Sequence, residues 1–174
     1  MIKYDLLVIG FGKAGKTLAA TFGNEGKKVA VVEESSEMYG GTCINIGCIP
    51  TKTLIVAADN KKEFKEAKAT RDTVVSKLNA KNFAMLDNNP NIDVYTASAK
   101  FVSNKVVEIS IDGETKQLEG DIVVINTGAK NNVLPIPGLT TSKNVYDSTQ
   151  FQKLESTPKT LGIIGGGNIG IEFA

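Results

Sequence analysis

The stretch Tyr4-Asp5-Leu6-Leu7-Val8-Ile9-Gly10-Phe11-Gly12-Lys13-Ala14-Gly15 decides the fold of this chain of 174 residues. Its apolar half predicts a buried parallel strand over Tyr4–Ile9, and a helix is expected from about Lys13 to Phe22. A glycine-rich loop joins the two. A strand, a glycine-rich loop and a helix in this order indicate the first βαβ unit of an α/β fold.

Two phosphate-binding patterns overlap in this loop. Gly10, Gly12 and Gly15 form the GxGxxG pattern of dinucleotide-binding folds. The run from Gly10 to Lys16-Thr17 also spells GxxxxGK[ST], the pattern of P-loop NTPases. Only one of the two patterns can describe the fold.

The later strands favour the dinucleotide pattern. It requires a second strand that ends in an acidic residue about 20 positions on, and Lys28–Val32 followed by Glu33 meets this requirement. An NTPase needs a later strand that ends in a magnesium-binding Asp, whereas Ile122–Ile125 ends in Asn126. A P-loop NTPase therefore stays as the weaker alternative. In the dinucleotide fold, the Lys-Thr pair of the other pattern is expected to be exposed in the first turn of the helix.

Each fixed position of the dinucleotide pattern has a separate expected role. Gly10 makes the turn, Gly12 lets the backbone approach a pyrophosphate, and Gly15 lets helix and strand pack closely. Glu33 is expected to accept hydrogen bonds from a ribose.

The only two cysteines, Cys43 and Cys48, lie in the run from Gly40 to Lys52. The four residues between them can curl, so a reversible disulfide is possible. Pro50 suits the first turn of a helix, which places Cys48 at or just before a helix N-terminus. There, backbone donors and the helix dipole lower a cysteine pKa towards neutrality. Lys52 lies one turn further on the same helix face.

Other interpretations of the cysteine pair are a structural disulfide, two buried thiols or half of a zinc site. Zinc would need two more ligands, and the chain has no His and no further Cys. No metal site is therefore expected.

The run from Gly40 to Lys52 resembles, at every fixed position, the GGTCxNxGCxPTK signature of the class I pyridine nucleotide-disulfide oxidoreductases. The resemblance implies a Rossmann-like FAD-binding domain of ββα-type nucleotide-binding topology, with FAD as cofactor and NADH or NADPH as co-substrate. It implies that Cys48 is the flavin-facing, charge-transfer sulfur and Cys43 the interchange thiol that meets the substrate. Lys52 would neighbour the flavin ring. The further cofactor-binding residues implied are Gly41, Thr42, Thr127, Gly128, Gly165, Gly167, Gly170 and Glu172.

The middle of the chain predicts two helices and several strands. The helices are expected at Pro50–Lys68 and Arg71–Leu86. The strands are expected at Ile92–Tyr95, Lys100–Ser110, Thr115–Leu118 and Ile122–Asn126, with Thr127-Gly128 at the carboxyl end of the last one, where ligands bind in open α/β sheets.

A second GxGxxG, at Gly165, Gly167 and Gly170, follows an expected strand at Leu161–Ile164. The predicted domains are therefore an FAD-binding domain over 1–140, a linker or crossing segment with a short helix over 141–158, and the start of an NAD(P)-binding domain over 159–174. Asn168 departs from the family, which often has an aromatic residue there that can cover the flavin.

Composition agrees with an ordinary soluble α/β protein: 41% hydrophobic, 22% charged and a net charge of +1. This balance suggests neither nucleic acid nor a membrane as partner. The apolar run Leu6–Ile9 is too short for a signal sequence or a spanning helix. A cytoplasmic location is expected, where a cysteine pair is more often catalytic than structural.

Four strings resemble a reactive-chlorine-resistance branch that is similar to mercuric reductase: Phe11–Leu18, Met38–Leu54, Ile125–Ala129 and Val145–Thr149. That branch implies a small oxidant as substrate, such as hypothiocyanous acid or Cu(II), and a homodimer. By this resemblance the chain covers only about the first two-fifths of a family member, so it is not expected to complete the cycle alone. The alternatives are a non-catalytic FAD-binding or redox-sensing module, and a dihydrolipoamide, glutathione or mercuric reductase.

Overall fold

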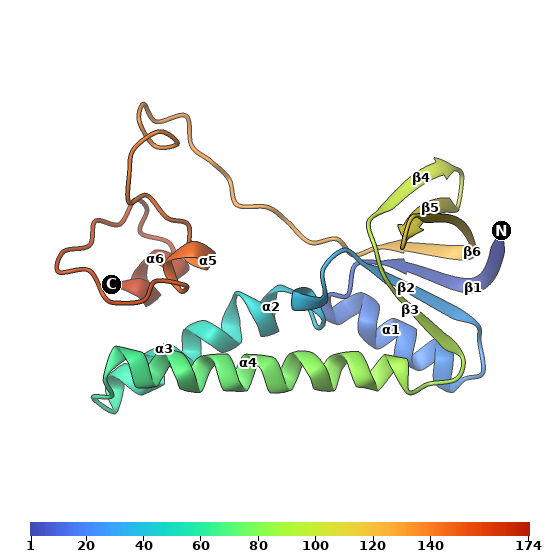
Figure 1. The fold of residues 1–174 in the computed structure, drawn as a ribbon, viewed down its shortest axis with the longest axis horizontal. Coiled ribbons are helices and arrows are strands. Elements are labelled where there is room, and N and C mark those ends of the chain that lie inside the picture. The colour runs from blue at the N-terminus through green and yellow to red at the C-terminus, as the bar shows by residue number, and fades with distance from the viewer. The chain divides into compact units, whose positions relative to one another are not determined.

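The computed structural model describes residues 1–174, which divide into two compact units (Figure 1). The first unit comprises Met1–Asn45 and Val75–Gly128, and the second comprises Ile46–Val74 and Ala129–Ala174. The long helix α4 (Phe64–Asp87) contributes residues to both. None of the helices combines the length and the apolar character that crossing a bilayer requires.

The first unit is built on one six-stranded sheet in the order β3-β2-β1-β6-β5-β4. The strands are β1 (Ile2–Ile9), β2 (Val29–Glu33), β3 (Ile92–Thr96), β4 (Ala99–Ser103), β5 (Val106–Ile111) and β6 (Glu114–Ile125). β1 pairs in parallel with β2 on one side and β6 on the other, so that Val8 lies opposite both Val31 and Val124. β5 pairs antiparallel with β6 and β4. The adjacency of β1 and β2 confirms the dinucleotide-type order expected from the first glycine pattern.

Side chains alternate between the two faces of the sheet, and each face has its own core. On one face Leu6 and Val8 pack with α1 (Lys13–Asn24) and with Leu86 of α4. On the other face Leu7 packs with residues of β5 and β6, such as Val107 and Leu118. Figure 1 shows α1 on one side of the parallel strands and the antiparallel strands curling over the other. Fully burying one such side chain contributes about 1.5–3 kcal/mol.

Shorter elements surround the cysteine run. A 3₁₀ turn, η1 (Ser36–Met38), and a single helical turn, α2 (Thr42–Asn45), belong to the first unit. The second unit holds α3 (Cys48–Asp59), α5 (Ser148–Phe151) and α6 (Asn168–Phe173). Within it, the rings of Phe151 and Phe173 meet edge to face, with 5.4 Å between their centroids.

The prediction that the helix after the cysteines runs to Lys68 is wrong, because α3 ends at Asp59. Asn60 turns its side-chain amide back onto the carbonyl of Val56, at 2.7 Å. Lys61 then takes a positive φ of 55°, which no α-helix can continue. α4 begins at Phe64, seven residues before the expected start.

Two strand predictions also change. The expected strands at Thr115–Leu118 and Ile122–Asn126 are one continuous strand, β6, and the expected strand at Lys100–Ser110 is two, separated by a turn in which Lys105 has a φ of 62°. Leu161–Ile164 forms no strand. No other extended segment of the described chain pairs with it, and an isolated strand leaves its backbone groups without partners.

Candidate cofactor site and redox cysteines

The loop between β1 and α1 has no room for side chains at its three glycines. A Cβ on Gly10 would lie 2.3 Å from the carbonyl oxygen of Asn126, and Gly10 has a φ of +98°. A Cβ on Gly12 would lie 2.8 Å from Asn126 Nδ2, and one on Gly15 would lie 2.6 Å from Val8 Cγ1. The loop therefore lies directly against the ends of β1 and β6, as the roles predicted for these glycines require.

Asn126 closes this loop, a role that the sequence did not reveal. Its backbone N–H donates to the carbonyl of Ile9 at 2.7 Å, and its side-chain amide donates to the carbonyl of Gly10 at 3.3 Å. An Asn directly after an apolar strand was the available signal, since a short amide can bond nearby backbone groups.

Helix α1 begins at this loop with unshielded backbone donors. Its N-cap is Gly12, which has no side-chain cap, and its first turn contains no acidic residue. Such an N-terminus favours an anion, because the free N–H groups and the helix dipole point towards it.

Glu33 lies at the end of β2, beside the same loop. Its carboxylate accepts a hydrogen bond from the backbone N–H of Phe11 at 2.8 Å and another from Ser35 N–H at 3.2 Å. Both bonds orient the carboxylate and tie it to the loop. An ionised carboxylate can accept about four hydrogen bonds, so acceptor capacity remains for a ribose.

The turn before Cys43 approaches the glycine loop closely. Gly41 has a φ of +78°, and a Cβ there would lie 2.7 Å from Gly12 Cα. Asn45 Nδ2 holds the turn by donating to the carbonyl of Gly41 at 2.9 Å. A Cβ on Gly128 would lie 4.0 Å from Thr42 Oγ1. The structure thus brings the predicted residue Gly41 to the glycine loop and Thr42 to Gly128, and adds Asn45.

The sequence predicted that Lys16 would be exposed in the first turn of the helix, and this prediction is wrong. Lys16 is half-buried, and its ammonium donates to Oδ1 of Asn82 on α4. Burial lowers the pKa of Lys16 below its ordinary value of 10.5, and the charge of Lys13 lowers it further. Its ammonium is therefore engaged by α4, whereas in a P-loop it would contact phosphates.

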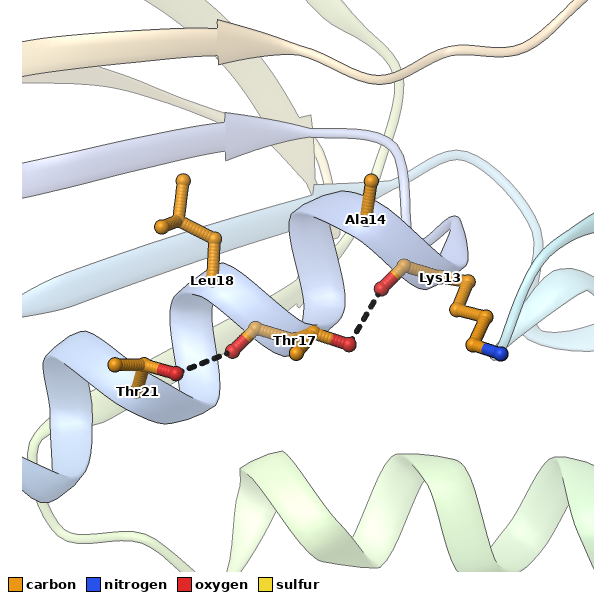
Figure 2. A pocket seen from close by; sticks show the side chains of 5 residues that line it. All are labelled: Lys13, Ala14, Thr17, Leu18 and Thr21. Atoms are coloured by element: carbon orange, nitrogen blue, oxygen red, sulfur yellow. Dashed lines mark hydrogen bonds between the residues drawn. The ribbon is translucent and has the colours of Figure 1, made fainter.

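Thr17, in contrast, is exposed as predicted. Its hydroxyl donates to the carbonyl of Lys13 at 2.8 Å. Figure 2 shows this part of α1, where Lys13, Ala14, Thr17, Leu18 and Thr21 line an open depression.

Cys48 is the first residue of α3, which confirms its predicted place at a helix N-terminus. Pro50 is buried in the first turn. Thr51 closes the turn, because its N–H and its hydroxyl both donate to the carbonyl of Gly47, at 3.2 Å and 2.8 Å. Cys48 is exposed, and Cys43 is half-buried in α2.

The second fingerprint shares only part of the geometry of the first, because a Cβ on Gly165 or Gly167 would meet nothing within 4 Å. Gly165 has a φ of +107°, a Cβ on Gly170 would lie 2.4 Å from the carbonyl oxygen of Gly165, and Gly167 is the N-cap of α6. Asn168 begins this helix. Glu172, one turn later, accepts the ammonium of Lys52 from α3. The sequence had predicted both residues in cofactor binding, without a contact between them.

Residues 4–174 match the family model of pyridine nucleotide-disulphide oxidoreductases. The chain belongs to this family. It is similar to the probable pyridine nucleotide-disulfide oxidoreductase RclA of Escherichia coli, with 49% identity over 100% of this chain and 40% of the relative. It is also similar to dihydrolipoyl dehydrogenase of Mycoplasma pneumoniae, with 34% identity over 99% of this chain and 41% of the relative. The chain therefore spans about two-fifths of the length of these relatives.

A solved structure supports the fold assignment. The Cu(II) complex of the HOCl-induced flavoprotein disulfide reductase RclA from Escherichia coli aligns with a TM-score of 0.96 and 49% identity, over 99% of this chain and 39% of that one. The α/β sheet, with its mainly parallel pairing, is thus the FAD-binding fold of this oxidoreductase family.

The residues present fit the cofactors of the pyridine nucleotide-disulphide oxidoreductases, FAD and NAD(P)H. The first glycine loop has a surface that any Cβ would fill, α1 presents free donors without a competing acid, and Glu33 retains acceptor capacity. The second loop repeats the positive φ at Gly165 and the glycine N-cap without a side-chain cap at Gly167. No group of three or more His, Cys, Asp or Glu side chains is placed to hold a metal ion.

Proposed function

We propose that this protein is an FAD-dependent NAD(P)H:disulfide-type oxidoreductase that reduces a small oxidant through Cys43 and Cys48. The single observation that carries this is the placement of Cys48 as the first residue of α3, in a chain whose glycine loop and Glu33 fit a dinucleotide. Bound FAD supplies two-electron transfer between the nicotinamide and the cysteine pair. The chain's own residues bind and orient the cofactors and stabilise charge on the cysteine pair.

The glycine loop and the α1 N-terminus bind the pyrophosphate, together with Gly41, Thr42, Thr127 and Gly128. Glu33 binds a ribose, and the loop at Gly165, Gly167 and Gly170 binds NAD(P)H. The N-terminus of α3 stabilises negative charge on Cys48. Lys52, held by Glu172, places a cation one turn further on the same helix.

Cys43 is the thiol that meets the oxidant. The two thiols lose two electrons and two protons, and a disulfide bond forms between them. Hypothiocyanous acid takes up both electrons and gives thiocyanate and water, whereas with Cu(II) two ions take one electron each and the protons go to solvent. Hypothiocyanous acid or a metal ion such as Cu(II) is the proposed oxidant. In support, a similar solved structure is a Cu(II) complex of an HOCl-induced flavoprotein disulfide reductase.

The domain organisation belongs to the same proposal. Residues 1–140 form the FAD-binding domain with the cysteine pair, 141–158 cross between domains, and 159–174 begin the NAD(P)-binding domain. The active protein is a cytoplasmic homodimer. Asn168 leaves the second fingerprint without the aromatic side chain that covers the flavin in many members.

The test is the visible spectrum of the whole protein before and after addition of NAD(P)H or dithionite. An oxidised flavin spectrum that NAD(P)H bleaches, with turnover of hypothiocyanous acid, is the expected result. Flavin that dithionite bleaches but NAD(P)H does not would indicate a redox-sensing module. Binding of magnesium-ATP without yellow colour would contradict the proposal altogether.

A further inference from the structure

Gln152 is a buried amide directly after α5, with 5% of its surface exposed. Its side-chain nitrogen donates to the carbonyl of Ser148 at 3.0 Å and to the carbonyl of Ile46 at 3.1 Å. Both neighbours are acceptors, so the amide must present its two N–H groups to them. The first bond curls the side chain back onto α5, and the second bond reaches 106 residues back along the chain.

Arg71 holds the backbone of the same residue. It is 6% exposed, and its Nη1 donates to the carbonyl of Gln152. Its Nε and Nη2 donate to Asp72 Oδ1, at 2.9 Å and 2.5 Å, which balances the charge. Burying a guanidinium costs free energy unless it is paired and hydrogen-bonded. Both ends of Gln152, backbone and side chain, are therefore fixed by buried bonds.

The carbonyl that Gln152 binds lies just ahead of Cys48. Ile46 precedes Gly47, the N-cap of α3, and Thr51 of that helix already binds the carbonyl of Gly47. The two peptide carbonyls before Cys48 are thus held from two directions, one by the helix that Cys48 begins and one by Gln152.

We propose that Gln152 is a positioning residue for the redox cysteine pair. Its amide fixes the backbone from Ile46 to Cys48, so that Cys48 keeps one position when the disulfide opens and closes. This inference rests on the proposed function of the cysteine pair. Fixing the backbone keeps the two thiols at a high effective concentration, which favours the disulfide over the dithiol. Loosening it makes the disulfide easier to reduce.

The test is an equilibrium titration of the whole FAD-loaded protein in dithiothreitol buffers, with thiols counted by alkylation and mass spectrometry. Reduced dithiothreitol supplies two electrons and two protons to the protein disulfide, which opens to two thiols while the reagent closes to its cyclic disulfide. Gln152→Met keeps the length of the side chain and removes the donor. We expect the equilibrium to shift towards the dithiol by up to about tenfold, because the shift cannot exceed the free energy of the one buried hydrogen bond that is lost; tenfold is about 30 mV in reduction potential.

A second measurement reports on the backbone directly. Amide hydrogen exchange at Thr51, whose N–H donates to the carbonyl of Gly47, should accelerate by up to about tenfold in Gln152→Met, because the backbone before Cys48 loses its second hydrogen bond. Gln150→Ala is the matched control. It removes the capping box that Gln150 forms with Asp147 at the start of α5, and it does not touch Ile46.

The variants give distinct outcomes. A potential for Gln152→Met equal to wild type, or a shift equal to that of Gln150→Ala, overturns the positioning role. Arg71→Lys weakens the hydrogen bond to the Gln152 carbonyl and should shift the reduction potential less, in the same direction. If Gln152→Met does not fold, an unchanged potential in Arg71→Lys overturns the inference. A wild-type protein without any reversible cysteine couple would instead contradict the proposed function itself.

Discussion

Lys52 of α3 forms an ion pair with Glu172 of α6, joining the helix that Cys48 begins to the helix of the second glycine fingerprint. Their side chains are 59% and 29% exposed, respectively. Water and salt screen such a pair, which contributes about 0–1 kcal/mol to stability. The ion pair therefore matters to the protein less for stability than for fixing the position of the Lys52 ammonium.

Lys52→Met should slow the reduction of bound FAD by NAD(P)H at least about tenfold, because a fixed cation stabilises negative charge that develops during the reaction. The melting temperature should move by no more than about 3 °C. Stopped-flow absorbance and thermal denaturation measure the two effects. Lys62→Met, which breaks the exposed Lys62–Glu66 pair, is the control. Equal slowing in both variants would contradict a specific role for Lys52.

The two cysteines should exchange their order of reactivity when FAD binds. Cys48 is exposed and Cys43 is half-buried in the cofactor-free chain, so Cys48 should be alkylated first. In the proposed complex, the flavin covers Cys48 and leaves Cys43 to react first. Peptide mass spectrometry after brief alkylation, with and without FAD, measures the order.

Single replacements assign the role of each sulfur. In the two-electron-reduced whole protein, Cys43→Ser should keep a long-wavelength thiolate–flavin absorbance and lose turnover, whereas Cys48→Ser should lose the absorbance. The reverse pattern would show that the two roles are exchanged.

Glu33→Ala should weaken FAD binding at least about tenfold and lower the free energy of unfolding by about 1–3 kcal/mol. Two backbone donors, the N–H groups of Phe11 and Ser35, lose their acceptor in this variant. Flavin fluorescence titration and urea denaturation are the measurements. The exposed neighbour Glu34→Ala is the control, and its stability should change by less than about 0.5 kcal/mol. Unchanged FAD affinity in Glu33→Ala would rule out the ribose contact.

Lys16 should make stability depend on pH in the alkaline range. Its pKa is lowered in the folded state, mainly by burial and further by Lys13, so the unfolded chain binds the proton more tightly. The free energy of unfolding therefore rises as pH increases from the folded-state pKa towards 10.5. Lys13→Met should reduce this rise by removing one cause of the shift, and Lys16→Met should abolish it. Urea denaturation from about pH 7 upwards tests this, and a rise that persists in Lys16→Met would assign it to another group.

The sequence predicted those features that depend on neighbouring residues. The strand at β1, the glycine loop and the start of α3 at Cys48 follow from short patterns whose geometry is local. The predicted end of α3 was wrong because Lys61 adopts a positive φ, which a lysine in the sequence does not indicate. Leu161–Ile164 has the composition of a strand, but a strand forms only where another strand pairs with it.

Side-chain contacts between distant segments could not be predicted from one sequence. Lys16 appeared exposed because its partner, Asn82, lies 66 residues away on α4. The bond from Gln152 to Ile46 likewise joins segments that share no motif. Such contacts depend on how helices pack, which spacing along a single element does not determine.

The position of β6 in the sheet has a consequence for synthesis of the chain on the ribosome. β1 pairs on one side with β2, which follows after about two dozen residues, but on its other side Ile9 pairs with Ile125. Closing so long a loop costs entropy before its contacts can form. A nascent chain therefore carries β1 with one unpaired, apolar edge until more than a hundred further residues have left the exit tunnel. During that interval the edge is available to chaperones and to other unfinished chains.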